Sequence, residues 1–167
     1  MTRRVLLGLA AVLTALLLQT AVLGRLQLPG GAPDLLLVVV VAFALVQGPL
    51  SGTVTGFLSG LVLDLGADHE LGRAAVVYAL VGYGAGLLAD ERPRTPALPL
   101  LVVAAAAAGA VGGYAVQGLL LGDPRITGAA FWSSLVGTTT YCVLLTPLVV
   151  PVLGALVRRL EDDPLRR

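Results

Sequence analysis

Long apolar runs, interrupted by short polar breaks, fill this chain of 167 residues. A helix needs about 20 mainly apolar residues to cross a hydrocarbon core about 30 Å thick. The runs therefore predict an all-α fold: a polytopic integral membrane protein, a bundle of about six transmembrane helices in a single transmembrane domain over residues 1–167. The expected helices cover about 5–23, 34–47, 50–66, 73–89, 97–121 and 129–157, and a short charged tail follows at 158–167.

Turn-forming residues mark several of these helix ends. Asp34 follows Pro33, and its side chain is suited to capping the N-terminus of the second helix. The second apolar stretch is only roughly 20 Å long if helical, and the turn at 47–49 leads directly into the third. We expect these two segments to form a tight helical hairpin, and whether each crosses the full bilayer stays open. Pro147 and Pro151 are expected to kink the last turns of the sixth helix.

The composition indicates that lipid surrounds most of the chain. Hydrophobic residues make up 57% of the sequence and charged residues 13%, whereas a soluble domain has roughly 25% charged residues. So few charges cannot cover the surface of a soluble domain, and we expect membrane lipid to be the main solvent. The formal net charge is +1, and because no basic tract is present we predict no nucleic-acid partner.

Arginine placement predicts the orientation of the bundle. With six spans, both termini share one side with the loops near 48 and 90–96. That side holds eight arginines, namely Arg3, Arg4, Arg92, Arg94, Arg158, Arg159, Arg166 and Arg167. The other side holds three, Arg25, Arg73 and Arg125. Because positive residues accumulate on the cytoplasmic side, we predict two cytoplasmic termini and a multi-pass location in the cell membrane.

Small residues recur every four positions along the third expected helix. They form one stripe on its surface, made of Gly52, Gly56, Gly60 and Asp64. Small residues let helix backbones approach closely, and lipid supplies no hydrophobic force that could replace this packing. The stripe is either a close contact with another helix of the same chain or a docking face for a partner's helix. Gly82 and Gly86, with the same spacing in the fourth helix, are predicted to pack internally.

Asp64 is the acidic residue within an otherwise apolar helix, and we expect it near the outer interface of the membrane. An intramembrane carboxylate is a functional hypothesis by default. The alternative is structural: Asp64 caps the fourth helix or pairs with Arg73.

Catalysis and metal binding have little support in the sequence. The chain has one histidine, His69, and one cysteine, Cys142, whereas a metal site usually needs several such ligands. We interpret Asp68, His69 and Glu70 as a solvated loop and predict neither a metal nor a cofactor. The serines lack the Gly-x-Ser-x-Gly pattern of a hydrolase. Since a nucleophile would also need a nearby base, we predict a protein that is not an enzyme.

Several ordered segments resemble the MreD family, the rod shape-determining membrane proteins of bacteria. The segments are Pro33-Asp34-Leu-Leu-Leu, Gly48-Pro49-Leu50-Ser-Gly52, Gly56-Phe-Leu-Ser-Gly60-Leu-Val-Leu-Asp64-Leu, Leu71-Gly72 and Tyr78-x-Leu-Val-Gly82-Tyr. The resemblance covers the whole chain in the number and length of spans, and its specific part is roughly residues 33–86. The family's recurrent residues that match here are Asp34, Gly52, Gly56, Gly60, Asp64, Gly72 and Gly82.

This resemblance implies a non-catalytic scaffold subunit of the cell-elongation (rod) complex, which controls cell shape and lateral peptidoglycan synthesis. It further implies that the chain links MreB filaments and an MreC-like bitopic protein to a RodA-like glycosyltransferase and a class B penicillin-binding transpeptidase. A second copy of the chain, forming a homodimer, is also considered as a partner.

The alternative is the substrate-binding membrane subunit of an energy-coupling-factor vitamin transporter, also a small six-helix protein. Ala11-x-x-x-Ala15 resembles the coupling motif of those subunits, although an alanine-rich helix contains this spacing by chance. A vitamin pocket needs convergent polar groups. The absence of Asn and Lys and the short outer loops argue against one. Tyr114, Phe131, Trp132 and Tyr141 are interpreted as interface anchors or packing residues.

Overall fold

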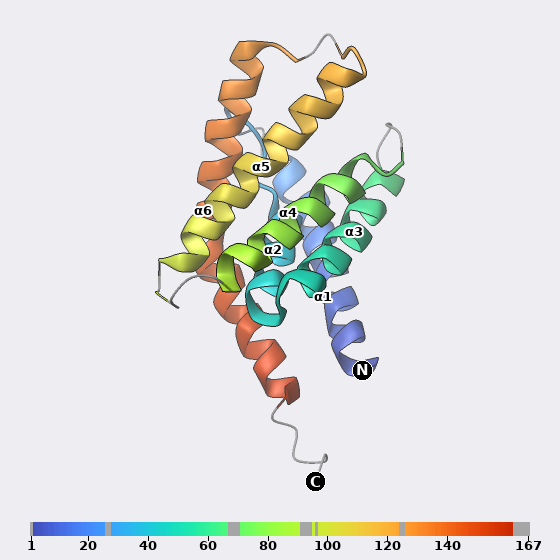
Figure 1. Cartoon of the computed structure of the whole chain (residues 1–167), viewed down its shortest axis with the longest axis vertical. Helices are drawn as coiled ribbons and strands as arrows, with labels where there is room; N and C mark the ends of the chain where they lie inside the picture. The colour runs from blue at the N-terminus through green and yellow to red at the C-terminus, as the bar shows by residue number, and fades with distance from the viewer. Residues whose placement is uncertain are drawn as a thin grey trace.

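The computed structural model describes residues 2–25, 28–66, 71–90, 95, 97–123 and 126–161. All regular secondary structure within these ranges is helical, as predicted, and forms one bundle of six α-helices (Figure 1). The helices are α1 (Thr2–Ala21), α2 (Leu35–Gln47), α3 (Pro49–Leu65), α4 (Arg73–Asp90), α5 (Leu98–Leu120) and α6 (Gly128–Glu161), with a short 3-10 helix η1 (Leu23–Arg25) after α1.

Each of the six expected segments overlaps one observed helix, and most ends agree within one or two residues. The largest correction is at the C-terminus. We expected a charged tail from residue 158, but α6 continues to Glu161. Arginine and leucine are good helix formers, and neither Gly nor Pro interrupts the chain there. The remaining tail residues lie outside the described part.

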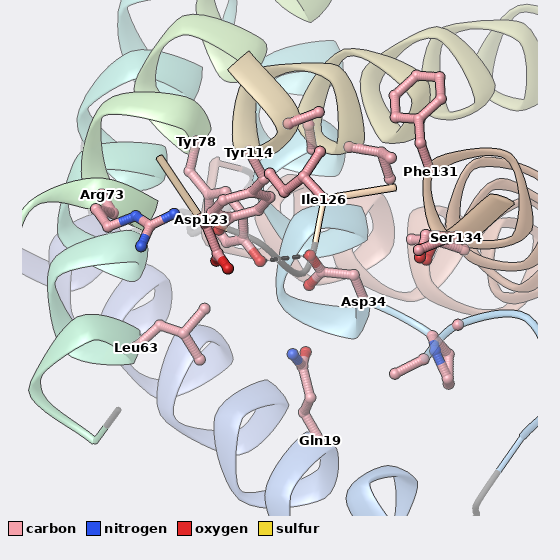
Figure 2. A pocket seen from close by; sticks show the side chains of 18 residues that line it. Gln19, Asp34, Leu63, Arg73, Tyr78, Tyr114, Asp123, Ile126, Phe131 and Ser134 are labelled. Atoms are coloured by element: carbon pink, nitrogen blue, oxygen red, sulfur yellow. Dashed lines mark hydrogen bonds between the residues drawn. The ribbon is translucent and has the colours of Figure 1, made fainter. Parts of the chain in front are cut away.

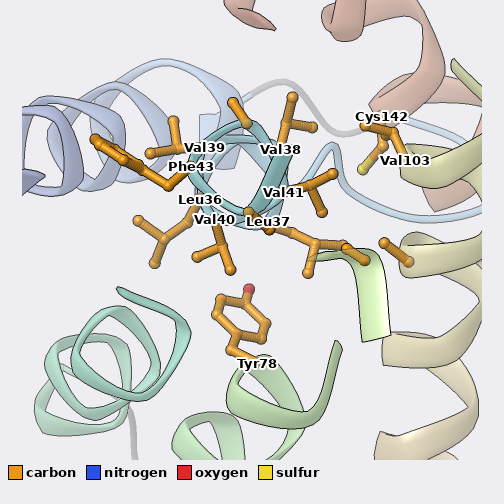
Figure 3. Packing of buried hydrophobic residues seen from close by; sticks show 14 of the residues in the cluster. Leu36, Leu37, Val38, Val39, Val40, Val41, Phe43, Tyr78, Val103 and Cys142 are labelled. Atoms are coloured by element: carbon orange, nitrogen blue, oxygen red, sulfur yellow. The ribbon is translucent and has the colours of Figure 1, made fainter. Parts of the chain in front are cut away.

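Helix α2 is the centre of the bundle. All its residues from Leu35 to Ala44 are buried, and α2 packs against each of the other five α-helices. Figure 3 shows its side chains extending in every direction into neighbouring helices, with Tyr78 of α4 below it. A helix that is apolar on all sides can be buried on all sides. This explains how a helix of only 13 residues is placed in the middle of the protein.

Asp34 caps α2 as predicted, because its side chain accepts a hydrogen bond of 3.0 Å from the backbone N–H of Leu37. At its other end, α2 turns into α3 through the single residue Gly48, whose φ of 87° favours glycine. Pro49 then takes the first position of α3, where its missing N–H leaves no hydrogen bond unmade. These local features form the tight α2–α3 turn that the sequence indicated.

The segment before α2 lies against the first half of α6. The hydroxyl of Tyr141 donates a hydrogen bond of 3.0 Å to the carbonyl of Pro29. Gly30 and Gly137 pack so closely that a Cβ atom on Gly137 would fall within 3.0 Å of the Gly30 backbone. These contacts join α6 to the segment that leads into α2.

The outer faces of the bundle are apolar. Leucines that are at least 66% exposed occur on five different helices, and examples are Leu17, Leu50, Leu80, Leu120 and Leu144. Exposed apolar surface of this extent is typical of a face in contact with lipid or a partner. By length and apolarity, two helices of the described chain are sufficient to cross a membrane, Leu98–Leu120 and Gly128–Val157. The apolar parts of α1, α2, α3 and α4 are shorter.

Helix α6 passes through both Pro147 and Pro151 without ending. Each proline lacks the N–H that would bond to the carbonyl four residues before it, so two turns of α6 lose a helical hydrogen bond. Figure 1 shows α6 changing direction between its orange and red halves. The start of α1 and the end of α6 lie at the same end of the bundle (Figure 1).

Candidate functional site

The glycine stripe of α3 lies directly against α4. A Cβ atom added at Gly56 would fall closer than 3.0 Å to the carbonyl group of Tyr78, and one at Gly60 equally close to the Ala74–Ala75 peptide. Gly52 meets the backbone of Gly82 in the same way. Real side chains essentially never make such contacts, so the two helix backbones touch only because these positions are glycines.

The glycines of α4 complete this contact, which we call the α3–α4 seam. A Cβ atom on Gly82 would fall within 3.0 Å of the Gly52 carbonyl group, and one on Gly86 equally close to the backbone of Pro49. Gly52 and Gly82 therefore face each other, the other three glycines each lie against the backbone of the opposite helix, and α4 covers the glycine face of α3. A partner's helix could reach that face only by displacing α4.

Asp64 closes the seam at the end of α3. Its side chain is 1% exposed and accepts hydrogen bonds from backbone N–H groups of Gly72 (2.8 Å), Ala74 (3.1 Å) and Ala75 (3.3 Å). The first N–H groups of a helix have no partner within the helix, and a carboxylate also interacts favourably with the positive end of the helix dipole. Asp64 thus acts as a cap for α4, supplied by the preceding helix.

The segment that joins Asp64 to Gly72 includes the expected solvated loop. Asp68, His69 and Glu70 lie outside the described residues. Within the described part of the chain, no group of three or more His, Cys, Asp or Glu residues is arranged to hold a metal ion.

A cavity of about 500 Å³ lies beside the seam, next to the N-terminus of α2. Its walls come from helices α1, α3, α4, α5 and α6 and from the segment that precedes α2. They include many polar side chains (Figure 2). The polar lining residues are Gln19, Asp34, Arg73, Tyr78, Tyr114, Asp123, Ser134 and Thr138. Leu63, Ile126 and Phe131 contribute apolar wall. We call this space the polar cavity.

Hydrogen bonds hold two of the polar groups in place. The hydroxyl of Tyr78 donates to one carboxylate oxygen of Asp34, and the N–H of Leu37 donates to the other. The side-chain oxygen of Gln19 accepts a bond of 2.9 Å from the N–H of Leu36. The first turn of α2 is therefore capped by side chains from its own N-cap and from α1, while α4 fixes the carboxylate.

The polar cavity corrects one step of the sequence argument. The absence of Asn and Lys argues against convergent polar groups, but this prediction is wrong because Asp, Arg, Tyr, Ser, Thr and Gln side chains converge instead. Tyr114 and Phe131, interpreted as anchors or packing residues, line the cavity. The ring of Tyr114 also packs edge-to-face on Tyr78 with centroids 6.5 Å apart. No local motif joins these residues, since they come from distant parts of the chain.

Comparison with known families adds a further observation. A model of the family described as rod shape-determining protein MreD matches residues 1–158. The chain belongs to the MreD family. No curated protein and no solved structure matched it in the parallel searches. Membership in the MreD family confirms the resemblance found in the sequence and implies a membrane protein with a role in determining rod cell shape. The matched region includes both the α3–α4 seam and the polar cavity.

Proposed function

We propose that the chain is a non-catalytic scaffold subunit of the bacterial cell-elongation complex. In this role it links MreB filaments and an MreC-like bitopic protein to a RodA-like glycosyltransferase and its class B penicillin-binding transpeptidase. The observation that carries the proposal is the family match over residues 1–158, which spans all six helices nearly to the end of α6. The exposed leucines on several helices offer apolar surface within the membrane for such partners.

We further propose that the six helices cross the cell membrane with both termini in the cytoplasm. The arginine distribution supports this orientation, with eight arginines on the terminal side and three on the other. The position of the start of α1 and the end of α6 at one end of the bundle agrees with an even number of spans (Figure 1).

The transporter alternative is favoured by one observation, the polar cavity, because a substrate-binding subunit needs such a site. Its coupling motif is less well supported. Ala15 is buried at 3% exposure, and both Ala11 and Ala15 line an apolar groove between α1, α2 and α6. A coupling surface would need these residues on an open face of α1.

Affinity capture from native membranes tests the scaffold proposal. The tagged chain, solubilised under mild conditions, is expected to recover MreC-like and RodA-like proteins. Recovery of a pair of ATPases with a membrane coupling subunit, and of no elongation protein, would replace the scaffold role with the transporter. A parallel complementation experiment in a strain depleted of its own family member should restore rod shape.

A further inference from the structure

The polar cavity contains an acidic group whose recorded partners are neutral. Asp34 accepts hydrogen bonds from the Leu37 N–H and the Tyr78 hydroxyl, and both of these donors are uncharged. A carboxylate removed from bulk water is costly unless hydrogen bonds or a counter-charge compensate it. Asp34 lines the cavity and is only partly buried. A cation entering the cavity could therefore reach it.

Asp34 also retains hydrogen-bonding capacity. A carboxylate has about four lone-pair sites, and Asp34 has three recorded donors, Leu37, Tyr78 and Gln19. One further N–H donor can thus bind the carboxylate without displacing them. A protonated primary amine fits this requirement, since it carries three donors and no acceptor. A quaternary ammonium carries the charge but no donor.

The other charged groups of the lining define the rest of the ligand. The cavity includes two carboxylates, Asp34 and Asp123, and one guanidinium, Arg73. This balance disfavours an anion that has no positive group. Figure 2 shows Arg73 at the left and Asp34 right of centre, with Asp123 and the two tyrosines between them. An arginine has five N–H donors, so Arg73 can donate to a ligand while it keeps protein partners.

We propose that the polar cavity binds a zwitterion, with its protonated primary amine at Asp34 and its anionic group toward Arg73. The volume of about 500 Å³ suits a small molecule or a lipid headgroup. Leu63, Ile126 and Phe131 would contact apolar parts of the ligand. Two sources share this chemistry: a free amino acid or short peptide, and the headgroup of phosphatidylethanolamine.

The test measures the melting temperature of the purified full-length chain in detergent with increasing amounts of defined probes. The lipid probes are phosphatidylethanolamine, phosphatidylcholine, whose amine has no N–H, and phosphatidylglycerol, which has no amine. The soluble probes are alanyl-alanine and N-acetyl-alanyl-alanine, which differ in the free amine. We expect at least one amine-bearing probe to raise the melting temperature with saturation, and its matched control to leave it unchanged.

The Asp34→Asn variant connects this response to the cavity. Asparagine is also an effective N-cap, and its single oxygen can still accept from the Leu37 N–H. The second oxygen, which accepts from Tyr78, becomes an NH2 group that can donate to the Tyr78 hydroxyl instead, so the variant removes the charge and reverses one hydrogen bond. We expect the apparent Kd of the active probe to weaken by about 10-fold or more. Tyr83→Phe, on the exposed side of α4, should respond like the wild type. Should Asp34→Asn fail to accumulate, Ala115→Phe adds a bulky side chain to the cavity lining while it keeps the Asp34 carboxylate, and it should abolish the response.

If phosphatidylethanolamine raises the melting temperature and alanyl-alanine does not, the ligand is a lipid headgroup. If alanyl-alanine raises it and phosphatidylethanolamine does not, the ligand is a free solute. The proposal is overturned if neither amine-bearing probe acts, or if phosphatidylcholine acts equally well. It is also overturned if the variants made in the cavity respond like the wild type.

Discussion

The hydroxyl of Tyr78 donates a hydrogen bond to the carboxylate of Asp34. At the same time, the backbone of Tyr78 lies against Gly56, where even a methyl group would not fit. One residue of α4 therefore belongs to both the α3–α4 seam and the polar cavity. Because the seam sets the position of Tyr78, a change at Gly56 is expected to disturb the contact with Asp34 as well.

Removal of the Tyr78 hydroxyl should destabilise the bundle. Tyr78→Phe keeps the buried ring and its packing on Tyr114 but deprives Asp34 of a donor. We expect the free energy of unfolding to fall by about 0.5–1.5 kcal/mol, within the range for intramolecular and membrane hydrogen bonds. Reversible unfolding in detergent measures this free energy. Tyr83→Phe is the control, since Tyr83 is 49% exposed on the same helix. Equal stability of the two variants would mean that the hydrogen bond contributes nothing.

The seam predicts opposite results for two glycine-to-alanine changes. At Gly56 the added methyl group meets the backbone of Tyr78, whereas at Gly84 it meets nothing within 4 Å. We expect Gly56→Ala to lower the free energy of unfolding by about 1–3 kcal/mol, because the added methyl group overpacks the seam. Gly84→Ala should be neutral or slightly more stable, because alanine favours the helix. Membrane abundance and unfolding in detergent measure both changes.

Partner recovery on the same samples separates the two interpretations of the stripe. If the stripe is an internal seam, the folded fraction of Gly56→Ala should still recover an MreC-like partner. Normal abundance and stability with loss of the partner would instead show that the stripe is a docking face. A double variant with Tyr78→Phe should deviate from additivity, because Gly56 and Tyr78 are in contact.

Asp64 is expected to act through hydrogen bonds to the start of α4. Asp64→Leu removes the recorded hydrogen bonds that the carboxylate accepts from Gly72, Ala74 and Ala75. It should lower the free energy of unfolding by about 1–3 kcal/mol, since it leaves buried donors without partners. Asp64→Asn retains one carbonyl oxygen and should cost less. Hydrogen exchange should become faster at the amides of these three residues. A phenotype in Asp64→Asn at normal stability would revive a role for the charge itself.

The topology proposal can be tested with reporter fusions. Fusions after Arg94 and after Arg167 should report a cytoplasmic location, and a fusion after Arg125 should report an external one. The physical basis is the arginine excess on the terminal side. Opposite locations for the two chain ends would contradict the six-span arrangement.

His69 offers a direct test of the non-catalytic role. It is the only histidine of the chain, so His69→Ala removes the side chain best suited to acid–base or metal chemistry near neutral pH. We expect rod shape to be retained in a complementation strain, with immunoblotting to confirm protein level. Loss of shape at a normal level would point to metal or proton chemistry in the 68–70 loop.

The amino-acid sequence alone determined the helices and their local ends. The length of an apolar run, a cap such as Asp34 and a turn glycine such as Gly48 act within a few neighbouring residues, so they can be recognised along the chain. The four-residue spacing of the glycines likewise indicated a close contact, because spacing fixes which side chains share a helix face. It did not indicate which helix would fill that face.

The packing of whole helices places α4 against the seam, encloses α2 and forms the polar cavity. In a membrane protein nearly every helix is apolar all round, because lipid accepts the same side chains as the protein interior. Apolarity therefore could not distinguish the enclosed α2 from the exposed faces of α5 and α6. The cavity brings together Gln19, Asp34, Arg73, Asp123 and Ser134. Their proximity depends on how whole helices pack, and no spacing along the chain records it.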